Sequence, residues 1–159
     1  MLPLGHLSVK FRSVGPDRQT RFTRSEQVTV LSLWSLLPSP LMLGANLPDN
    51  DAWTLSLLTN PEVLAVDQDS AGNAARRILH DDVSEVWERT LSDGSIAVGL
   101  FNVDGLDGSV SVPLQDLGLS GRYTGRDLWL RKDLGVVPDT LTMSVPAHSA
   151  VLIRLKKAQ

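Results

Sequence analysis

The sequence predicts an α+β protein in which a helix–strand–helix segment precedes an antiparallel β-sandwich. Three patterns predict it: a capped apolar helix over residues 23–37, a short apolar run over 41–43, and apolar–polar alternation with a period of two after about residue 82. Because the period changes once, we expect two parts, 1–82 and 83–159. The total of 159 residues, 42% of them hydrophobic, suits one or two small globular domains.

The first helix is expected to begin at the capping box Thr23-Arg-Ser-Glu26 and to cover residues 25–37. In a capping box, the Thr hydroxyl and the Glu carboxylate each accept a hydrogen bond from a backbone N–H that the helix leaves unpaired. Two apolar faces follow, separated by a narrow strip of small polar residues. The faces carry Val28, Leu31 and Trp34, and Val30, Leu33 and Leu37; the strip carries Thr29, Ser32 and Ser35. A helix this apolar needs protein neighbours on most of its sides.

A short strand is expected after this helix. Pro38 and Pro40 end the helix, because each proline pushes the preceding residue toward extended geometry. The apolar residues 41–43 then predict a strand buried on both faces, as in a parallel sheet that helices cover. The small residues at 44–46 end the strand at a point where another group can approach closely.

Two more helices are expected before the β region. The first covers residues 49–60, with Asp49 or Asn50 as its cap. The second begins at Asn60-Pro61, with the asparagine as cap and the proline in the first helical position, and ends near residues 67–69. On the N-terminal side, the triplet Gly15-Pro16-Asp17 predicts a turn in a surface loop.

Six short strands are expected in the β region. Gly- and Asp-rich turns separate them, which is typical of an antiparallel sandwich. The expected strands cover residues 85–90, 95–102, 109–113, 122–129, 141–145 and 150–155.

The sequence gives no reason to expect a nucleic-acid, membrane or metal partner. A net charge of −3 gives no electrostatic reason to expect a nucleic-acid partner. No apolar run reaches the roughly 18–20 residues of a membrane span, so no membrane partner is expected. The chain has no cysteine, and His6, His80 and His148 do not have the spacing of metal ligands. We therefore expect no metal and no cofactor.

Three acidic pairs could supply the two carboxylates of a glycosidase, which lie roughly 5–5.5 Å apart in retaining and 6.5–9.5 Å apart in inverting enzymes. Each pair lies at an expected helix end or near the junction of the two parts, so we interpret them as capping or solvated groups and assign no catalytic residue. Trp87 and Trp129 could stack on a sugar ring, but sandwich core is the favoured interpretation for both. The acidic pairs are Asp67 with Asp69, Asp81 with Asp82, and Glu85 with Glu88.

Four motifs in order resemble the C-terminal third of melibiase-type α-galactosidases, a clan that includes α-N-acetylgalactosaminidases. They are LW at residues 33–34, SPL at 39–41, NPEVLAVDQD at 60–69 and VWER at 86–89. The resemblance implies that the helix over 25–37 and the strand over 41–45 are the seventh helix and eighth strand of a (β/α)8 TIM barrel. It also implies that 1–82 is the C-terminal remnant of that barrel, followed by the sandwich.

The activity that the resemblance implies is retaining hydrolysis of terminal α-galactosides, with an α-galactoside as the carbohydrate partner of the full-length enzyme. The family's two catalytic aspartates match no residue of this chain. Met1 matches a methionine of the family's galactose pocket, and we expect Gly44 and Asn46, at the end of the eighth strand, to bind substrate. The family commonly has Asn-Asp where this chain has Ala45-Asn46, which leaves the sugar specificity open.

Because Met1 matches an internal position of the family motif, a truncated reading frame or a fragment is expected, and the chain alone is expected to be inactive. The alternative is a stand-alone carbohydrate-binding or interaction module built on the sandwich. A secreted or a periplasmic parent would both be compatible with the sequence, which determines neither the localisation nor the oligomeric state.

Overall fold

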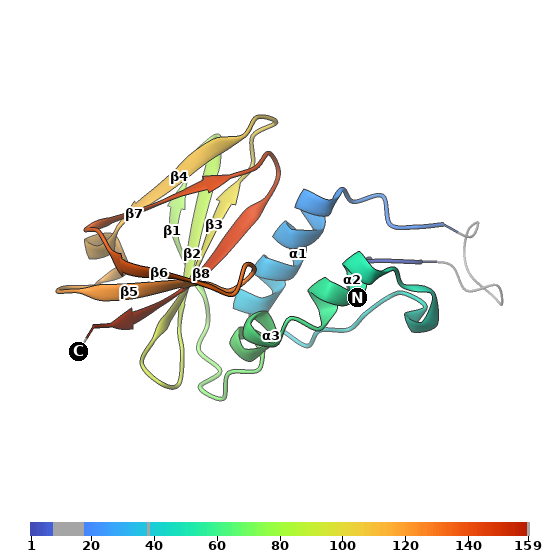
Figure 1. The fold of residues 1–159 in the computed structure, drawn as a ribbon, viewed down its shortest axis with the longest axis horizontal. Coiled ribbons are helices and arrows are strands. Elements are labelled where there is room, and N and C mark those ends of the chain that lie inside the picture. Colours follow the sequence, from blue (N-terminus) through green and yellow to red (C-terminus); the bar gives the residue numbers. More distant parts are fainter. Residues whose placement is uncertain (8–17, 38, 159) are drawn as a thin grey trace.

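The computed structural model describes residues 1–7, 18–37 and 39–158, and shows a β-sandwich with helices packed against one side (Figure 1). The turn expected at residues 15–17 lies outside the described residues. The helical elements are α1 (Arg24–Leu36), a 3-10 turn (Leu47–Asp49), α2 (Ala52–Leu58), α3 (Pro61–Asp67) and a second 3-10 turn (Leu114–Leu117). The strands are β1 (Arg76–His80), β2 (Ser84–Thr90), β3 (Ile96–Asn102), β4 (Gly108–Pro113), β5 (Tyr123–Asp127), β6 (Lys132–Val137), β7 (Thr140–Val145) and β8 (Ala150–Lys157).

Helix α1 begins as the sequence predicts. Thr23 is its N-cap, and both hydrogen bonds of the capping box with Glu26 are present. The most deeply buried side includes the small polar residues Ser32 and Ser35, both 0% exposed, while Trp34 is only partly buried. The strip of small residues is therefore the side on which α1 approaches its neighbours most closely.

Helix α2 is shorter than expected and has a different cap. The side chain of Asp51 accepts a hydrogen bond from the backbone N–H of Thr54, so the cap is Asp51 and not Asp49 or Asn50. Residues 47–49 form a separate 3-10 turn, which explains why the helix begins later. Helix α3 has the predicted Asn60 cap and Pro61 start, and it ends at Asp67.

The expected strand at residues 41–43 is reduced to a single bridge, and its burial was predicted wrongly. Leu43 forms a parallel bridge with Leu2, while the side chain of Met42 is 60% exposed. The segment that contains Leu2 also forms an antiparallel bridge further along, between His6 and Gln19. The exposure of Met42 shows that one of its faces has no layer of protein over it.

The β region forms the expected antiparallel sandwich. A six-stranded sheet in the order β1-β2-β3-β8-β5-β6 faces the two-stranded sheet β4-β7. The core between the sheets contains buried side chains such as Val98, Leu100, Val112 and Ile153. Strands β1 and β6 were not expected. Strand β1 lies before the boundary expected at residue 82, yet it pairs with β2.

The outer face of the large sheet is covered by α1 and α3. All seven residues of β3 are buried, which a strand with one solvated face would not show. A second core, which includes Leu36 of α1, Val63 of α3 and Phe101 of β3, fills this junction. Gly99 makes the close approach possible, because a Cβ there would lie 2.6 Å from the Cδ1 of Leu36.

Candidate functional site

The structure places two of the three predicted site residues side by side. The backbone N–H of Leu2 donates to the carbonyl of Met42 (2.6 Å), and that of Gly44 donates to the carbonyl of Leu2 (2.9 Å). An added Cβ on Gly44 would lie 3.4 Å from the Cε of Met1, so the two residues are in contact. Met1 itself is 77% exposed.

Asn46 lies at the same edge, further along the chain. Its backbone N–H donates to the carbonyl of His6 (2.9 Å), which extends the pairing of the two parallel segments. The two segments run in the same direction, so their carboxyl ends meet at one edge. The loops after residues 4 and 43 therefore converge.

This edge carries two polar side chains that sequence analysis did not select. The amide of Asn46 donates to the carboxylate of Asp49, and the same carboxylate oxygen lies 3.3 Å from Nδ1 of His6. The side chain of His6 is 18% exposed and that of Asp49 is 48% exposed. The sequence held one signal for His6. A glycine follows an apolar residue in both segments, as Leu4-Gly5 directly before His6 and as Leu43-Gly44.

Gly5 keeps this edge compact. Its φ of +75° is a conformation that glycine adopts readily, and an added Cβ would meet the side-chain oxygen of Asn50 at 2.0 Å. That oxygen accepts the backbone N–H of His6 (3.2 Å). The glycine thus allows the side chain of Asn50 to hold the loop that carries His6.

The edge can position a polar ligand but lacks the groups for hydrolysis. Asp49 supplies the carboxylate that contacts Asn46 and His6. The neighbouring Asp51 is engaged as a helix cap, where the backbone N–H of Thr54 lowers its pKa. A glycosidase needs two carboxylates on either side of the bond that breaks. Across residues 1–7, 18–37 and 39–158, no group of three or more His, Cys, Asp or Glu could hold a metal ion.

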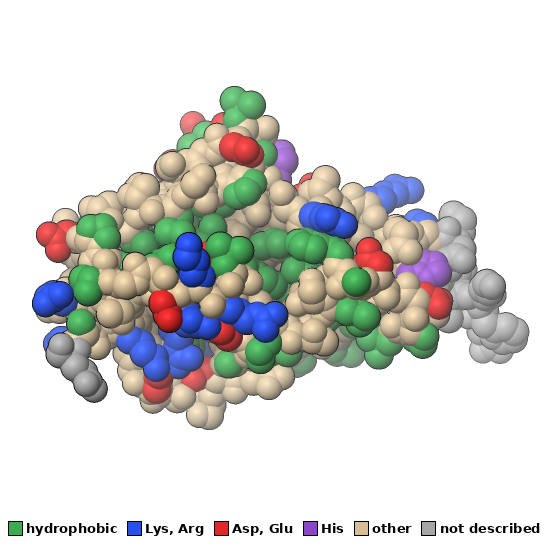
Figure 2. Space-filling view, in the orientation of Figure 1, with side chains coloured by type: hydrophobic (Ala, Val, Ile, Leu, Met, Phe, Trp, Pro, Cys, Tyr) green, Lys and Arg blue, Asp and Glu red, His purple; other side chains and the backbone are tan. Residues whose placement is uncertain are grey.

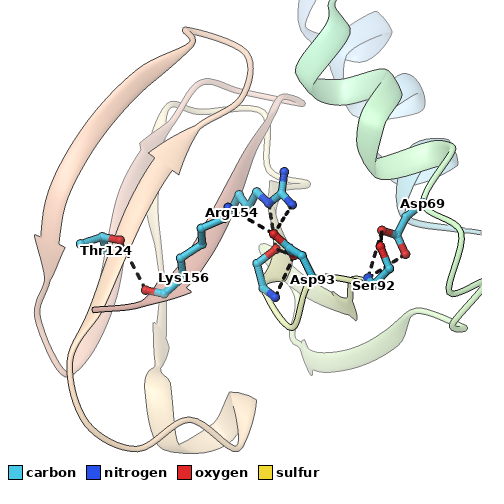
Figure 3. A network of polar contacts seen from close by, with 7 residues as sticks. Asp69, Ser92, Asp93, Thr124, Arg154 and Lys156 are labelled. Carbon is cyan, nitrogen blue, oxygen red and sulfur yellow. Dashed lines mark hydrogen bonds and ion pairs between the residues drawn. The ribbon is translucent and has the colours of Figure 1, made fainter. Parts of the chain in front are cut away.

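Four of the six carboxylates in the three acidic pairs make structural contacts. The carboxylate of Asp69 accepts the backbone N–H and the hydroxyl of Ser92 (3.0 and 2.6 Å; Figure 3), and these bonds lower its pKa. Asp81 accepts the N–H of Ser84 (2.7 Å). Glu85 pairs with His80 (2.9 Å) and Glu88 with Arg76 (3.0 Å). The Oδ1 of Asp67 is buried without a hydrogen-bond partner among the described residues, and burial raises the pKa of this carboxyl.

The two tryptophans considered for sugar stacking both pack at the junction of the sandwich and the helices. Trp87 packs at the junction of sheet and helices, with the guanidinium of Arg77 5.9 Å from its ring centre. Trp129 donates from Nε1 to the hydroxyl of Ser32 (2.8 Å). Both side chains are partly buried, so they contribute to the packing of α1 on the sandwich.

Comparison with known proteins gives one family match. Residues 81–155 match the model of the alpha galactosidase C-terminal beta sandwich domain. Alpha-galactosidase D of Emericella nidulans is 34% identical over 135 residues, which are 84% of this chain and 20% of that protein. Alpha-galactosidase 2 of Arabidopsis thaliana is 30% identical over 137 residues, 85% of this chain and 35% of that protein. The chain thus spans about a fifth to a third of the length of these relatives.

Solved structures match over a longer part of the chain. A GH27 β-L-arabinopyranosidase from Geobacillus stearothermophilus is 42% identical with a TM-score of 0.90, covering 99% of this chain and 36% of the other. A variant of that enzyme has been solved in complex with arabinose. Alpha-galactosidase I from Mortierella vinacea is 28% identical with a TM-score of 0.82, covering 86% of this chain and 36% of the other.

Proposed function

We propose that the chain is the C-terminal portion of a melibiase-type glycoside hydrolase, because residues 81–155 match the model of the α-galactosidase C-terminal β-sandwich domain. In this proposal residues 1–82 complete a (β/α)8 barrel and residues 83–159 form the sandwich, with β1 of the first part paired to the sandwich sheet. The hydrolysis of galactose-type glycosides belongs to the complete enzyme.

The observation that carries the barrel proposal is the parallel pairing of Leu2 with Leu43 across helix α1. Two parallel strands joined through a helix form a β-α-β unit, which is the repeating unit of a TIM barrel. Active sites of such barrels lie at the carboxyl ends of the strands. Gly44 and Asn46 follow the second segment at that end, and Met1 contacts Gly44, which supports a role of the three residues in substrate binding.

Two related glycosides are candidate substrates. The curated relatives named above are α-galactosidases, which favours a terminal α-D-galactoside. The identity of 42% to a β-L-arabinopyranosidase favours a β-L-arabinopyranoside as the second candidate. The two sugars share the arrangement of their ring hydroxyls and differ in the exocyclic CH2OH group, so one pocket can discriminate between them only at that group.

The test compares the chain with a longer protein that carries it at the C-terminus, read from an in-frame upstream sequence. Nitrophenyl α-D-galactoside and nitrophenyl β-L-arabinopyranoside are the two probes. We expect residues 1–159 to hydrolyse neither, because the family's two catalytic aspartates match no residue of this chain, while the longer protein hydrolyses one of them. Turnover by residues 1–159 that a single Asp or Glu substitution abolishes would refute the proposal.

Asn46→Leu in the longer protein tests the binding role of the barrel edge. We expect a higher KM or a lower kcat, since a polar contact near the sugar is lost. Leu47→Ala is the matched control, because Leu47 is 63% exposed and adjoins the same loop. Equal kinetics of the Asn46→Leu and Leu47→Ala proteins would contradict the role of Asn46.

A further inference from the structure

A crevice lies at the junction of helices and sandwich, and its walls include none of Met1, Gly44 and Asn46. It has a volume of about 480 Å³ and lies between α1, α2 and the turns that follow β5 and β7. Its walls include Trp53, Trp129, Asp127 and Arg131, and we call it the tryptophan crevice. Figure 2 shows hydrophobic side chains gathered along this junction, with Lys and Arg side chains beside them. We propose that the tryptophan crevice binds a single pyranose sugar.

The aromatic walls supply the apolar part of such a site. An indole presents a flat apolar surface together with a polar N–H, which suits a ring that is apolar on its C–H faces and polar at its rim. The Trp129 ring is fixed, because its Nε1 donates to Ser32. The guanidinium of Arg24 lies 4.9 Å from the centre of the Trp53 ring, which also restricts that side chain. Two fixed indoles lose little side-chain entropy when a ligand binds.

The polar part of the site comes from the turn after β5. The carboxylate of Asp127, only 3% exposed, accepts the backbone N–H of Leu130 (2.9 Å). A carboxylate has about four acceptor positions, so it can accept a sugar hydroxyl as well. Arg131 follows with a φ of 52°, the left-handed conformation that a non-glycine residue rarely adopts. This turn places an acceptor and a donor on the same wall.

The chemistry of the walls favours a small neutral ring over other ligands. The opposite charges of Asp127 and Arg131 offset each other, so the crevice offers no net attraction to an ion. Its volume lies within the usual 300–1,000 Å³ of small-molecule sites. Apolar walls with a few converging polar groups are what such sites share. A pyranose meets all three conditions.

The crevice is independent of the proposed hydrolase. None of Met1, Gly44 and Asn46 lines it, and every residue of its walls belongs to the described chain. Sugar binding by residues 1–159 and hydrolysis by a longer protein are therefore separate measurements, and either can fail without the other.

The tryptophans themselves provide the readout. The chain has four, at positions 34, 53, 87 and 129, and each gives one indole N–H signal in a proton–nitrogen correlation spectrum. D-galactose or L-arabinose added to residues 1–159 should shift the signals of Trp53 and Trp129 and leave those of Trp34 and Trp87 in place. We expect weak binding with a Kd of about 1 mM, as for a ligand of this size. D-glucitol, an open-chain polyol, should cause no shift because it has no ring.

Two variants and one control separate binding from folding. Trp53→Leu should weaken binding about tenfold or more through loss of the stacking surface. Arg131→Gly should weaken it about threefold, and it keeps the turn because glycine adopts the left-handed conformation readily. Trp87→Phe, at a partly buried tryptophan outside the crevice, should bind as the parent does.

Two results would overturn the proposal. The first is no shift of the Trp53 and Trp129 signals with either sugar at about 50 mM, far above the expected Kd. The second is a folded Arg131→Gly protein and a folded Trp53→Leu protein that both bind with the parent affinity. In that case the sugar binds elsewhere, or the crevice receives a different kind of ligand.

Discussion

The guanidinium of Arg89, on strand β2, donates a hydrogen bond to the backbone carbonyl of Ser35 near the end of helix α1 (3.2 Å). The same nitrogen donates to the carbonyl of Val66 near the end of α3 (3.0 Å). The Arg89 side chain is 1% exposed. One buried cation of the sandwich thus stabilises the carboxyl ends of two helices, where the helix dipole favours positive charge.

Replacement of Arg89 should destabilise the whole chain. Arg89→Ala leaves the carbonyls of Ser35 and Val66 buried without this donor and opens a cavity, so we expect the free energy of unfolding to fall by about 3 kcal/mol. Urea unfolding followed by circular dichroism measures this loss. Arg122→Ala is the control, because Arg122 is exposed and its loss should change stability by less than about 0.5 kcal/mol. Equal unfolding midpoints for the two variants would contradict the role of Arg89.

A side chain at position 99 should separate α1 from the sheet. In Gly99→Ala, the added methyl would lie 2.6 Å from both Leu36 and the ring of Phe101, which are themselves buried. We expect a loss of about 1–3 kcal/mol in unfolding free energy from overpacking. In the matched variant Gly108→Ala, the nearest atom, on Asn102, lies 3.7 Å away, and stability should hardly change. A Gly99→Ala protein as stable as Gly108→Ala would refute this account of the packing.

The ion pair between Glu62 of α3 and Arg126 of β5 should make the free energy of unfolding depend on pH. Two hydrogen bonds from Arg126 to the Glu62 carboxylate (both 2.7 Å) lower the pKa of Glu62 in the folded protein. A carboxyl group with a lowered folded pKa contributes stability above its unfolded pKa of about 4.3 and loses it as pH falls through the folded pKa. Glu62→Gln should lower the melting temperature by about 2 °C at pH 7.

This difference should shrink as pH falls below about 4.3, because the parent protein then loses the same interaction. Thermal melts of both proteins across the acidic range measure it. The double variant Glu62→Gln with Arg126→Met should lose less melting temperature than the two single variants lose in sum. A Glu62→Gln deficit that is constant from neutral to acid pH would show that the pair contributes nothing through its charge.

The sandwich should not fold well without its helices. A protein of residues 83–159 lacks α1 and α3, so it would expose side chains of the second core such as Phe101, Leu128 and Leu152. Each large apolar side chain left in water forgoes about 1.5–3 kcal/mol, and a domain's net stability is only about 5–15 kcal/mol. We expect residues 1–159 to unfold cooperatively in urea. We expect residues 83–159 to be unfolded or aggregated already without urea. A cooperative transition of 83–159 at the parent midpoint would contradict this.

Local signals in the sequence predicted most helix ends and six of the strands. The caps at Thr23 and Asn60 could be predicted because they depend on residues two or three positions apart. Strand β1 was missed because its sequence, RRILH, has a charged or polar residue at each end, and β6 because Gly135 interrupts its alternation. Both strands depend on pairing with neighbours more than on their own composition.

The packing of α1 could not be predicted from its apolar faces. Hydrophobicity alone ranks Ser32 and Ser35 below Leu33 and Trp34, yet the two serines are fully buried. Ser32 lies against Trp129, a residue 97 positions later, and no periodic pattern contains that contact. The same limit applied to the candidate site, because the approach of Asp49 to His6 depends on how two loops meet in space.

The order of the large sheet has a consequence for how the protein is made. Strand β8, the last of the eight described strands in sequence order, lies in the middle of the sheet between β3 and β5. The sheet therefore cannot form completely until residues 150–157 have left the ribosome. Until then, the edge of β3 that pairs with β8 has no partner. Such long-range pairing folds slowly and leaves strand edges open to association. Until β8 pairs with both strands, the facing edges of β3 and β5 stay available to other chains.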